Sequence, residues 1–463
     1  MKTALFLLSA ITMTGCARFQ PQPLSPETTA AAFEERSLND AGLHRFAAAH
    51  PPTAPISWPP AQWDLESLTL AAIYFSPEIA VARVNADSVS AGKTTAAQRP
   101  NPSLTVNPAY NVTHGVPSPW LVTASLDVPI ETAGKRSYRM AQAAHLSEAA
   151  RLSVATVAWE TRLRLRRALI ELWAAEESAR LLDQQQAAQD SIVHLLEDEI
   201  AAGALSPTAA ARERIALEQT RLARLEAESR RDQARIQLAA AIGLPAQAMV
   251  ATVISFSAFN DAPRDLPEAS ARRCAMLGRS DILSALAEYA AAEAALQLEI
   301  AKQYPDLHLS PGYEFDQGDN KWGLGLGMTL PLLNQNQGPI AEAEARRREK
   351  AVKFQTLQAR VIGEIDTALA ACWNARQKLT TAAALLDQAQ QQERTARAMT
   401  EAGEVGAQAL AAAKLEVAAA ALSQLEARLK TQQAFATLEG ALQASPEILE
   451  SALATSEPTP DSP

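Results

Sequence analysis

The cysteine at position 16 has the clearest chemistry in this sequence, because it directly follows a short apolar leader. The leader reads MKTALFLLSAITMTGC, with a positive start and small residues just before Cys16. Its apolar run is too short to span a bilayer, so a signal peptide is predicted over 1–15. The pattern is that of a bacterial lipobox and predicts a lipidated Cys16, with simple cleavage near Gly15 as the alternative. Ala17 stands where Asp would favour the inner membrane, so the outer membrane is predicted.

The remaining candidates for catalysis or metal binding lack the spacing that such chemistry needs. Cys274 and Cys372 each stand alone, and we predict buried thiols. The GLGLG run at 323–327 lacks the spacing of a nucleotide-binding loop and predicts one face of a strand. We therefore predict no enzyme activity, no cofactor and no metal site. The histidines are scattered without metal-ligand spacing, at positions 44, 50, 114, 145, 194 and 308.

The charge balance argues against nucleic acid as a partner. The chain has 463 residues, with 42 Lys and Arg against 52 Asp and Glu, which gives a net charge of −10. Phosphate binding needs clustered positive charge, and no dense basic patch is present. The two basic runs, RLRLRR at 162–167 and ARRREK at 345–350, are predicted to be solvated helix faces with Glu nearby.

A pair of strand-like segments occurs twice in the sequence, and these segments are the elements that would position any site. The segment NPSLTVNPAYN near residue 100 corresponds to YPDLHLSPGYEF near 305, and Pro102 and Pro305 are 203 residues apart. A second segment follows each copy, WLVTASLDVPI at 120–130 and WGLGLGMTLPL at 322–332. The repetition predicts two copies of one unit of hairpin and helices.

Strict alternation in these segments predicts membrane strands. Apolar side chains recur at every second position, with small or polar residues between them. This period over about ten residues is typical of barrel strands with one face to lipid and one to the lumen, and strand-end Trp and Tyr suit an interfacial girdle. A half-buried hairpin of a soluble protein is the alternative. The predicted lipid-facing residues are Trp120, Val122, Leu126, Trp322, Leu324, Leu326 and Met328.

Long helices follow each hairpin. Uninterrupted helical patterns over 134–200 and 339–402 predict rods of about 100 Å, packed like coiled coils and not as a globule. Each ends at a glycine-containing turn, at 201–208 and 401–408, before a returning helix. A reversal between antiparallel helices requires Gly in a left-handed conformation.

These observations predict the following organisation of the chain. A signal peptide (1–15) precedes a lipidated extended segment (16–62), a first repeat (63–243) with its hairpin at 102–130, an inter-repeat segment (244–268), a second repeat (269–443) with its hairpin at 305–332, and a tail (444–463).

Four strands cannot close a barrel, and open strand edges cannot face lipid because their N–H and C=O groups would stay unsatisfied. Three chains would supply twelve strands, within the range of known outer-membrane barrels. We therefore predict a mixed α and β membrane protein, a homotrimer whose 12-stranded β-barrel continues into a long periplasmic α-helical barrel.

The chain resembles the TolC family of outer-membrane efflux proteins over nearly its whole length. The resemblance rests on NPSL, DVPIETAGKR (127–136), LPLLNQNQG (330–338) and the two turns. The IETAGKR and PLLNQNQG segments are most similar to the heavy-metal branch, which serves cobalt–zinc–cadmium or copper–silver pumps. Drug efflux, type I protein secretion and a non-conducting structural lipoprotein are the alternatives.

The resemblance implies particular partners. A proton-driven inner-membrane pump of the resistance-nodulation-division type would select the cargo, and a periplasmic adaptor would join it to this outer-membrane duct in a Gram-negative bacterium. Ala409 and Ala412 stand where related channels carry gating acids, so a ring of Glu401 and Glu404 is the remaining gate hypothesis. The adaptor-docking residues implied at the turns are Gly203, Leu205, Ser206, Gly403, Val405 and Gly406.

Overall fold

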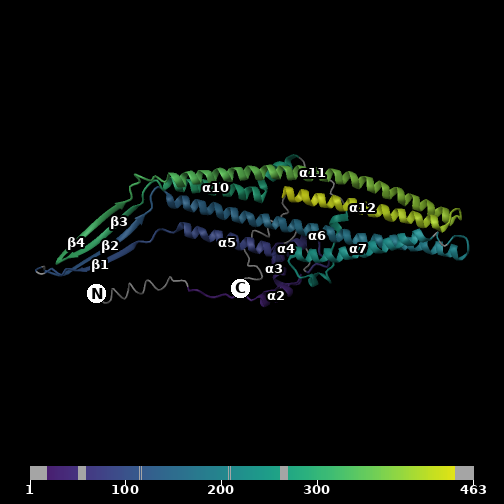
Figure 1. The fold of residues 1–463 in the computed structure, drawn as a ribbon, viewed down its shortest axis with the longest axis horizontal. Coiled ribbons are helices and arrows are strands. Elements are labelled where there is room, and N and C mark those ends of the chain that lie inside the picture. The colour runs from purple at the N-terminus through teal and green to yellow at the C-terminus, as the bar shows by residue number, and fades with distance from the viewer. Residues whose placement is uncertain are drawn as a thin grey trace.

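A computed structural model describes residues 18–50, 59–113, 115, 117–206, 208, 210–260 and 269–443. The molecule is elongated, with a small β-sheet at one end and a layer of long helices running away from it (Figure 1). The leader, Cys16 and the tail at 444–463 lie outside the described residues, as do 261–268 of the inter-repeat segment.

The sheet has four antiparallel strands in chain order, β1 (Ser103–Tyr110), β2 (Trp120–Ile130), β3 (Leu307–Asp316) and β4 (Asp319–Met328). The last strand starts and ends earlier than the predicted 322–332. A two-residue turn at Gln317 and Gly318, with φ of 53° and 122°, joins β3 directly to β4. Such a tight turn fixes the register, so β4 ends at Met328 and the apolar residues beyond it are not in the strand.

Two helices of 67 and 65 residues form the long axis, α6 (Lys135–Ala201) and α11 (Gln337–Glu401). Each is preceded by a residue in the left-handed conformation, Gly134 with φ 72° and Asn336 with φ 63°. These residues turn the chain from the end of a strand into the helix. At 1.5 Å per residue each rod is about 100 Å long.

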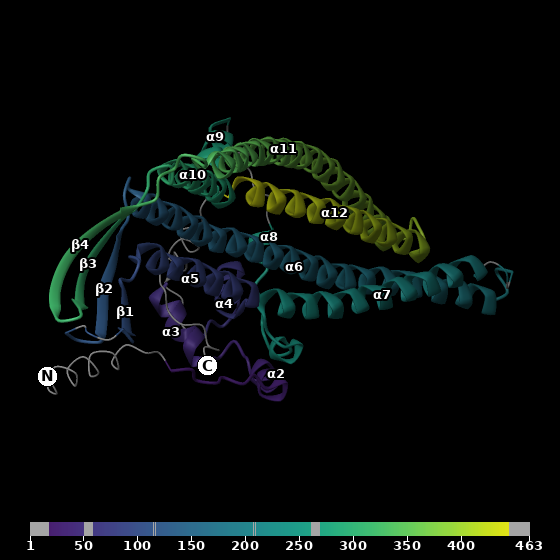
Figure 2. The ribbon, with the colours of Figure 1, turned by 60° about the vertical axis from the view of Figure 1, so that its left-hand side comes forward.

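Shorter helices pack in pairs along the two rods. The helices α5 (Pro77–Ala97) and α7 (Ala211–Ile242) lie along α6, nearer to and farther from the sheet. The helices α10 (Ser280–Ala301) and α12 (Ala407–Leu442) pack between α6 and α11 in the same way. The two halves of the chain thus have the same order of elements, and together they form one curved helical layer (Figure 2).

The hydrophobic core is concentrated around the middle of the layer. Here α4 (Leu65–Phe75), the 3-10 helix η1 (Ala246–Met249) and α8 (Ser257–Asn260) cover the junction of α6, α7 and α12. A second cluster joins α9 (Ala269–Gly278) to α10, α11 and α12. A backbone bridge between Trp63 and Ile254 connects the segment before the first half to the one between the halves.

The prediction of an extended segment over 16–62 is wrong for two stretches, α2 (Pro26–Glu34) and α3 (Ala41–Ala49). Pro26 is the first residue of α2, a position where its missing N–H costs nothing. The Asp40 carboxylate caps α3 by accepting hydrogen bonds from two backbone amides. Pro26 therefore marks the start of a helix and not part of a continuous extended chain.

Within the described ranges, no helix alone has the length and apolarity to cross a membrane. Only when α4 and α5 are taken together is a segment long and apolar enough, and this pair is bent by 51°.

Candidate functional site

The sheet has one apolar face, and the register aligns it across all four strands. Leu104 pairs with Leu126, and Leu309 with Leu326. Aromatic pairs occupy the end near the hairpin turns: Tyr110 and Trp120 meet edge-to-face with centroids 5.2 Å apart, and Tyr313 and Trp322 lie 4.9 Å apart. Most of the predicted lipid-facing residues are exposed, with Val122 half-buried: Trp120, Val122, Leu126, Trp322, Leu324, Leu326 and Met328.

The opposite face of the sheet consists largely of polar residues and glycines. On β4 the three glycines of GLGLG occupy one face, as predicted, opposite His308, Ser310 and Gly312 of β3. A Cβ at Gly325 would lie 3.3 Å from the Ser310 Cβ, so the glycines also permit close packing of the two strands. The other polar residues of this face are Ser103, Thr105, Asn107, Thr123, Ser125, Asp127, Glu314, Asp316, Asp319 and Lys321.

The outer edges of the sheet have no strand partner within the described chain. The order β1-β2-β3-β4 leaves one side of β1 and one side of β4 unpaired. Every residue of both edge strands is exposed. Unpaired edges of this kind offer N–H and C=O groups with which further strands can pair.

A polar network fixes the junction between sheet and helices, and sequence reasoning missed it. Arg139 donates to the Ala96 and Gln98 carbonyls at the end of α5, each at 2.9 Å, and pairs with Glu131 at 2.7 Å. Arg136 donates to the Ala97 carbonyl at 2.9 Å. Two arginines of α6 thus satisfy the last carbonyls of α5, which have no partner inside their own helix.

The two hairpins are tied together at the same level. Lys135 forms a 2.7 Å ion pair with Asp306, which also accepts the Thr132 amide at 3.0 Å. The Thr132 hydroxyl donates to the Pro305 carbonyl at 2.6 Å. Burial opposes ionisation of Asp306, but the hydrogen bonds from Lys135 and Thr132 outweigh it and hold its pKa below the ordinary value. Lys135, in the IETAGKR segment, was the residue that could have indicated this contact, but its partner Asp306 lies far away in sequence.

At the far end of both rods the predicted turns have one common geometry (Figure 1). Gly203 and Gly403 both have φ of 76°. The amides of Ala204 and Glu404 donate to carbonyls five residues earlier, each at 2.9 Å, as in a Schellman cap. All six predicted tip positions lie at these turns: Gly203, Ser206, Gly403 and Gly406 are exposed, and Leu205 and Val405 are half-buried. Glu401 and Glu404 are also exposed.

Midway along the layer, an arginine joins helix ends in each half. Arg279 is 5% exposed; it donates to the Ala441 carbonyl at 2.5 Å and pairs with Asp281 at 2.7 Å. We call this contact between the ends of α12 and α10 the second joint. In the first joint, between the ends of α7 and α4, Arg36 donates to the carbonyls of Gly243 and Phe75, both at 3.3 Å.

One basic run, at 162–167, is solvated only in part: Arg164 and Arg167 are exposed as predicted, and two other arginines are not. Arg162 and Arg166 are largely buried and share a single partner on α12, Glu439, with Arg162 at 2.6 Å. Burial, with repulsion from Arg162, lowers the pKa of Arg166 to about 10. The prediction fails because Glu439 lies 277 residues from Arg162 and leaves no local pattern. The prediction of two buried thiols is also half wrong: burial raises the pKa of Cys372 to about 11, whereas Cys274 is exposed.

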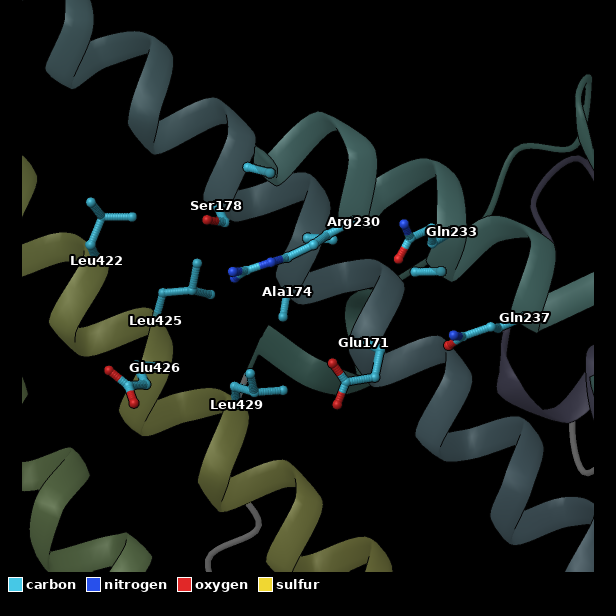
Figure 3. A pocket seen from close by; sticks show the side chains of 13 residues that line it. Glu171, Ala174, Ser178, Arg230, Gln233, Gln237, Leu422, Leu425, Glu426 and Leu429 are labelled. Carbon is cyan, nitrogen blue, oxygen red and sulfur yellow. The ribbon is translucent and has the colours of Figure 1, made fainter. Parts of the chain in front are cut away.

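A groove of about 510 Å³ lies where α6, α7 and α12 diverge (Figure 3). Leu422, Leu425 and Leu429 line its α12 side, and Arg230 extends into it from α7. Glu171, on α6, accepts a 2.5 Å hydrogen bond from Gln433 beside it. The groove contains no nucleophile–base pair. Across the described ranges, no group of three or more His, Cys, Asp or Glu side chains is placed to hold a metal ion.

An apolar sheet on a rod of helices is the architecture of an outer-membrane efflux channel. Two stretches, residues 71–244 and 273–443, match the outer membrane efflux protein family and cover about three quarters of the chain. The chain belongs to this family.

Within the family the chain is similar to the cobalt-zinc-cadmium resistance protein CzcC of Cupriavidus metallidurans, with 27% identity over 232 residues. The match covers 50% of this chain and 54% of CzcC, so the chain spans about half the length of this curated relative. The predicted resemblance to the TolC family and its heavy-metal branch is thereby confirmed.

Solved structures share the fold. CusC superposes with a TM-score of 0.66 at 16% identity, covering 82% of this chain and 91% of CusC. The channel OprN gives 0.67 at 15% identity, covering 92% and 99% of the two chains. The open state of MtrE from Neisseria gonorrhoeae gives 0.66 at 17% identity, covering 82% and 88%.

Proposed function

We propose that the chain is the outer-membrane duct of a tripartite efflux pump that exports heavy-metal cations. The similarity to CzcC carries the choice of cargo, since that relative is a cobalt-zinc-cadmium resistance protein. Membership of the outer membrane efflux family supports passive conduction and not catalysis.

Three copies would complete the structure. The unpaired edges of β1 and β4 run antiparallel to each other, so the β4 edge of one copy suits the β1 edge of the next. Three four-stranded sheets give a 12-stranded barrel, with the apolar face toward lipid and the glycine-rich face toward the lumen. On this proposal each chain supplies two copies of one unit, and rods of about 100 Å extend the barrel into the periplasm.

The two tips are the proposed docking sites for a periplasmic adaptor, which would connect the duct to a proton-driven inner-membrane pump. Their exposed glycines permit close approach of a partner, and the common cap gives each tip the same shape. We also propose that Cys16 is lipidated and anchors the chain to the outer membrane, which mass spectrometry of the mature N-terminus tests directly.

The cargo is tested by deleting the gene and measuring growth in cobalt, zinc, cadmium, copper and silver salts. Loss of tolerance to at least one cation, restored by the gene on a plasmid, is expected. Unchanged tolerance to all five would refute a metal cargo. The control is a plasmid copy with proline at Thr105, in β1; it should not restore tolerance, because proline removes an amide donor of the β1–β2 ladder.

A further inference from the structure

We propose that His308 and Asp127, on the polar face of the sheet, form a weak binding site for divalent transition-metal ions. His308 Nε2 would be the ligand, and Asp127 the residue that positions the imidazole. The site lies at the end of the sheet nearest the helices, where β2 and β3 pair. Its biological role as a stopping point for cargo rests on the proposed function, but binding itself does not.

The hydrogen bonds determine which imidazole nitrogen is available. His308 Nδ1 lies 3.0 Å from Asp127 Oδ2, and the Ser310 hydroxyl donates to the same carboxylate at 3.2 Å. A carboxylate at neutral pH is an acceptor only, so Nδ1 must carry the proton. A neutral imidazole then has its lone pair on Nε2. A carboxylate that orients a histidine in this way is the usual companion of a metal-binding imidazole.

The Nε2 atom is also accessible. His308 has its side chain 43% exposed, and within the described chain its only hydrogen-bonding partner is Asp127. The residues beside it on the neighbouring strands are Pro129 and Gly327, neither of which has a polar side chain. A Cβ at Gly327 would already lie 3.6 Å from the His308 Cβ, so the glycine keeps this side of the imidazole open.

The Asp127 carboxylate differs from its neighbours in the side chain that it faces. The neighbouring carboxylates of the junction hold basic partners, Glu131 with Arg139 and Asp306 with Lys135. Asp127 instead faces a histidine and accepts the Ser310 hydroxyl.

Chemistry and number of ligands define the ion and its affinity. Imidazole nitrogen suits zinc, copper, cobalt and nickel, whereas magnesium prefers oxygen ligands and water. With one imidazole and water as the remaining ligands, binding would be weak and exchange rapid. Rapid release is what a conduit requires, because a tight site would stop passage.

The experiment measures current through the purified full-length protein in planar bilayers, with potassium chloride as the electrolyte and zinc chloride added. Zinc should lower the current in a saturable way, and the same concentration of magnesium should not. The D127N variant should weaken the zinc effect about 10- to 100-fold, as for other residues that orient a ligand. The H308Q variant should weaken it further.

The matched control is H145Q, which changes an exposed histidine on α6 and should leave the zinc effect unchanged. Circular dichroism of each variant verifies folding. A second measurement, electron paramagnetic resonance of bound Cu²⁺, should lose one imidazole-nitrogen signal in H308Q and keep it in D127N. The proposal is overturned if zinc has no effect on the wild type, acts like magnesium, or acts equally on H308Q.

These results separate the site from the cargo. Zinc binding that depends on His308, in a protein whose deletion leaves metal tolerance unchanged, would remove the cargo proposal and keep the site. Metal sensitivity of the deletion strain without His308-dependent binding would do the reverse.

Discussion

Replacing Arg279 with methionine tests whether the second joint depends on its buried guanidinium. Methionine keeps much of the aliphatic length and removes the charge. The substitution leaves Asp281, with its side chain 16% exposed, without its bidentate partner, and leaves the Ala441 carbonyl without its 2.5 Å donor.

The expected cost follows from these contacts. Removing one partner of a buried ion pair costs about 3–5 kcal/mol. Asp281 keeps one hydrogen bond, from the Ile282 amide at 2.9 Å, so the lower end of that range applies. A loss of about 3 kcal/mol corresponds to roughly 100-fold faster opening, at about 1.4 kcal/mol per factor of ten.

Hydrogen exchange followed by mass spectrometry measures this opening locally. Peptides over 276–284 and 438–443 should exchange roughly 100-fold faster in R279M, whereas peptides at the tips should not change. The control is R360M, because Arg360 is 64% exposed and only 3.5 Å from Glu364; it should cost less than about 0.5 kcal/mol. An acceleration below about fivefold at the joint, under 1 kcal/mol, would refute the reasoning.

A double variant refines the test. If the cost of R279M comes from the stranded carboxylate, R279M with D281L should recover part of the protection, because an apolar pair often replaces a buried ion pair without loss. No recovery would assign the cost to the Ala441 carbonyl instead.

Three further predictions concern other contacts. Gly243→Ala should lower the thermal midpoint, because φ is +91° and the new Cβ would lie 2.6 Å from the Phe75 carbonyl oxygen; an unchanged midpoint would contradict the model of the first joint. Glu439→Gln should destabilise by about 3–5 kcal/mol in denaturant unfolding, since it strands two buried arginines; a neutral result would mean that water reaches them. Because folding lowers the pKa of Asp306, its ionised carboxylate should stabilise the junction at pH values above 3.8, the ordinary pKa. This contribution should be lost as the pH falls through the lower pKa of the folded state. Thermal midpoints should therefore fall more steeply in acid for the wild type than for D306N, which cannot titrate; equal slopes would exclude the Lys135 pair as the cause.

The strands could be located from the sequence because their signal is local. Alternation places Leu324 and Leu326 on one face wherever the sheet lies, and the register then aligns them with β3. The sequence signals for the long helices and their tips were equally local, since Gly203 and Gly403 end uninterrupted helical patterns. The end of β4 was not, because the turn at Gln317 and Gly318 sets it from the other side of the hairpin.

The contacts that fix the arrangement were beyond sequence reasoning. Lys135 and Asp306 are 171 residues apart, and Arg162 and Glu439 are 277 apart, so no spacing rule connects them. The burial of Arg162 depends on α12 crossing α6, which is a property of the packed layer. Asp127 and His308 were likewise seen separately, on strands that pair only in the folded sheet.

The open edges of β1 and β4 have a genetic consequence. In the proposed assembly each strand edge pairs with another copy, so closure depends on every member. A defective β1 edge should therefore be dominant: expressed beside the normal gene, it would enter mixed assemblies and prevent their closure. A defective tip would leave closure intact and reduce only the contacts of its own copy. Dominance in co-expression thus distinguishes damage to the proposed barrel wall from damage to the proposed docking tips.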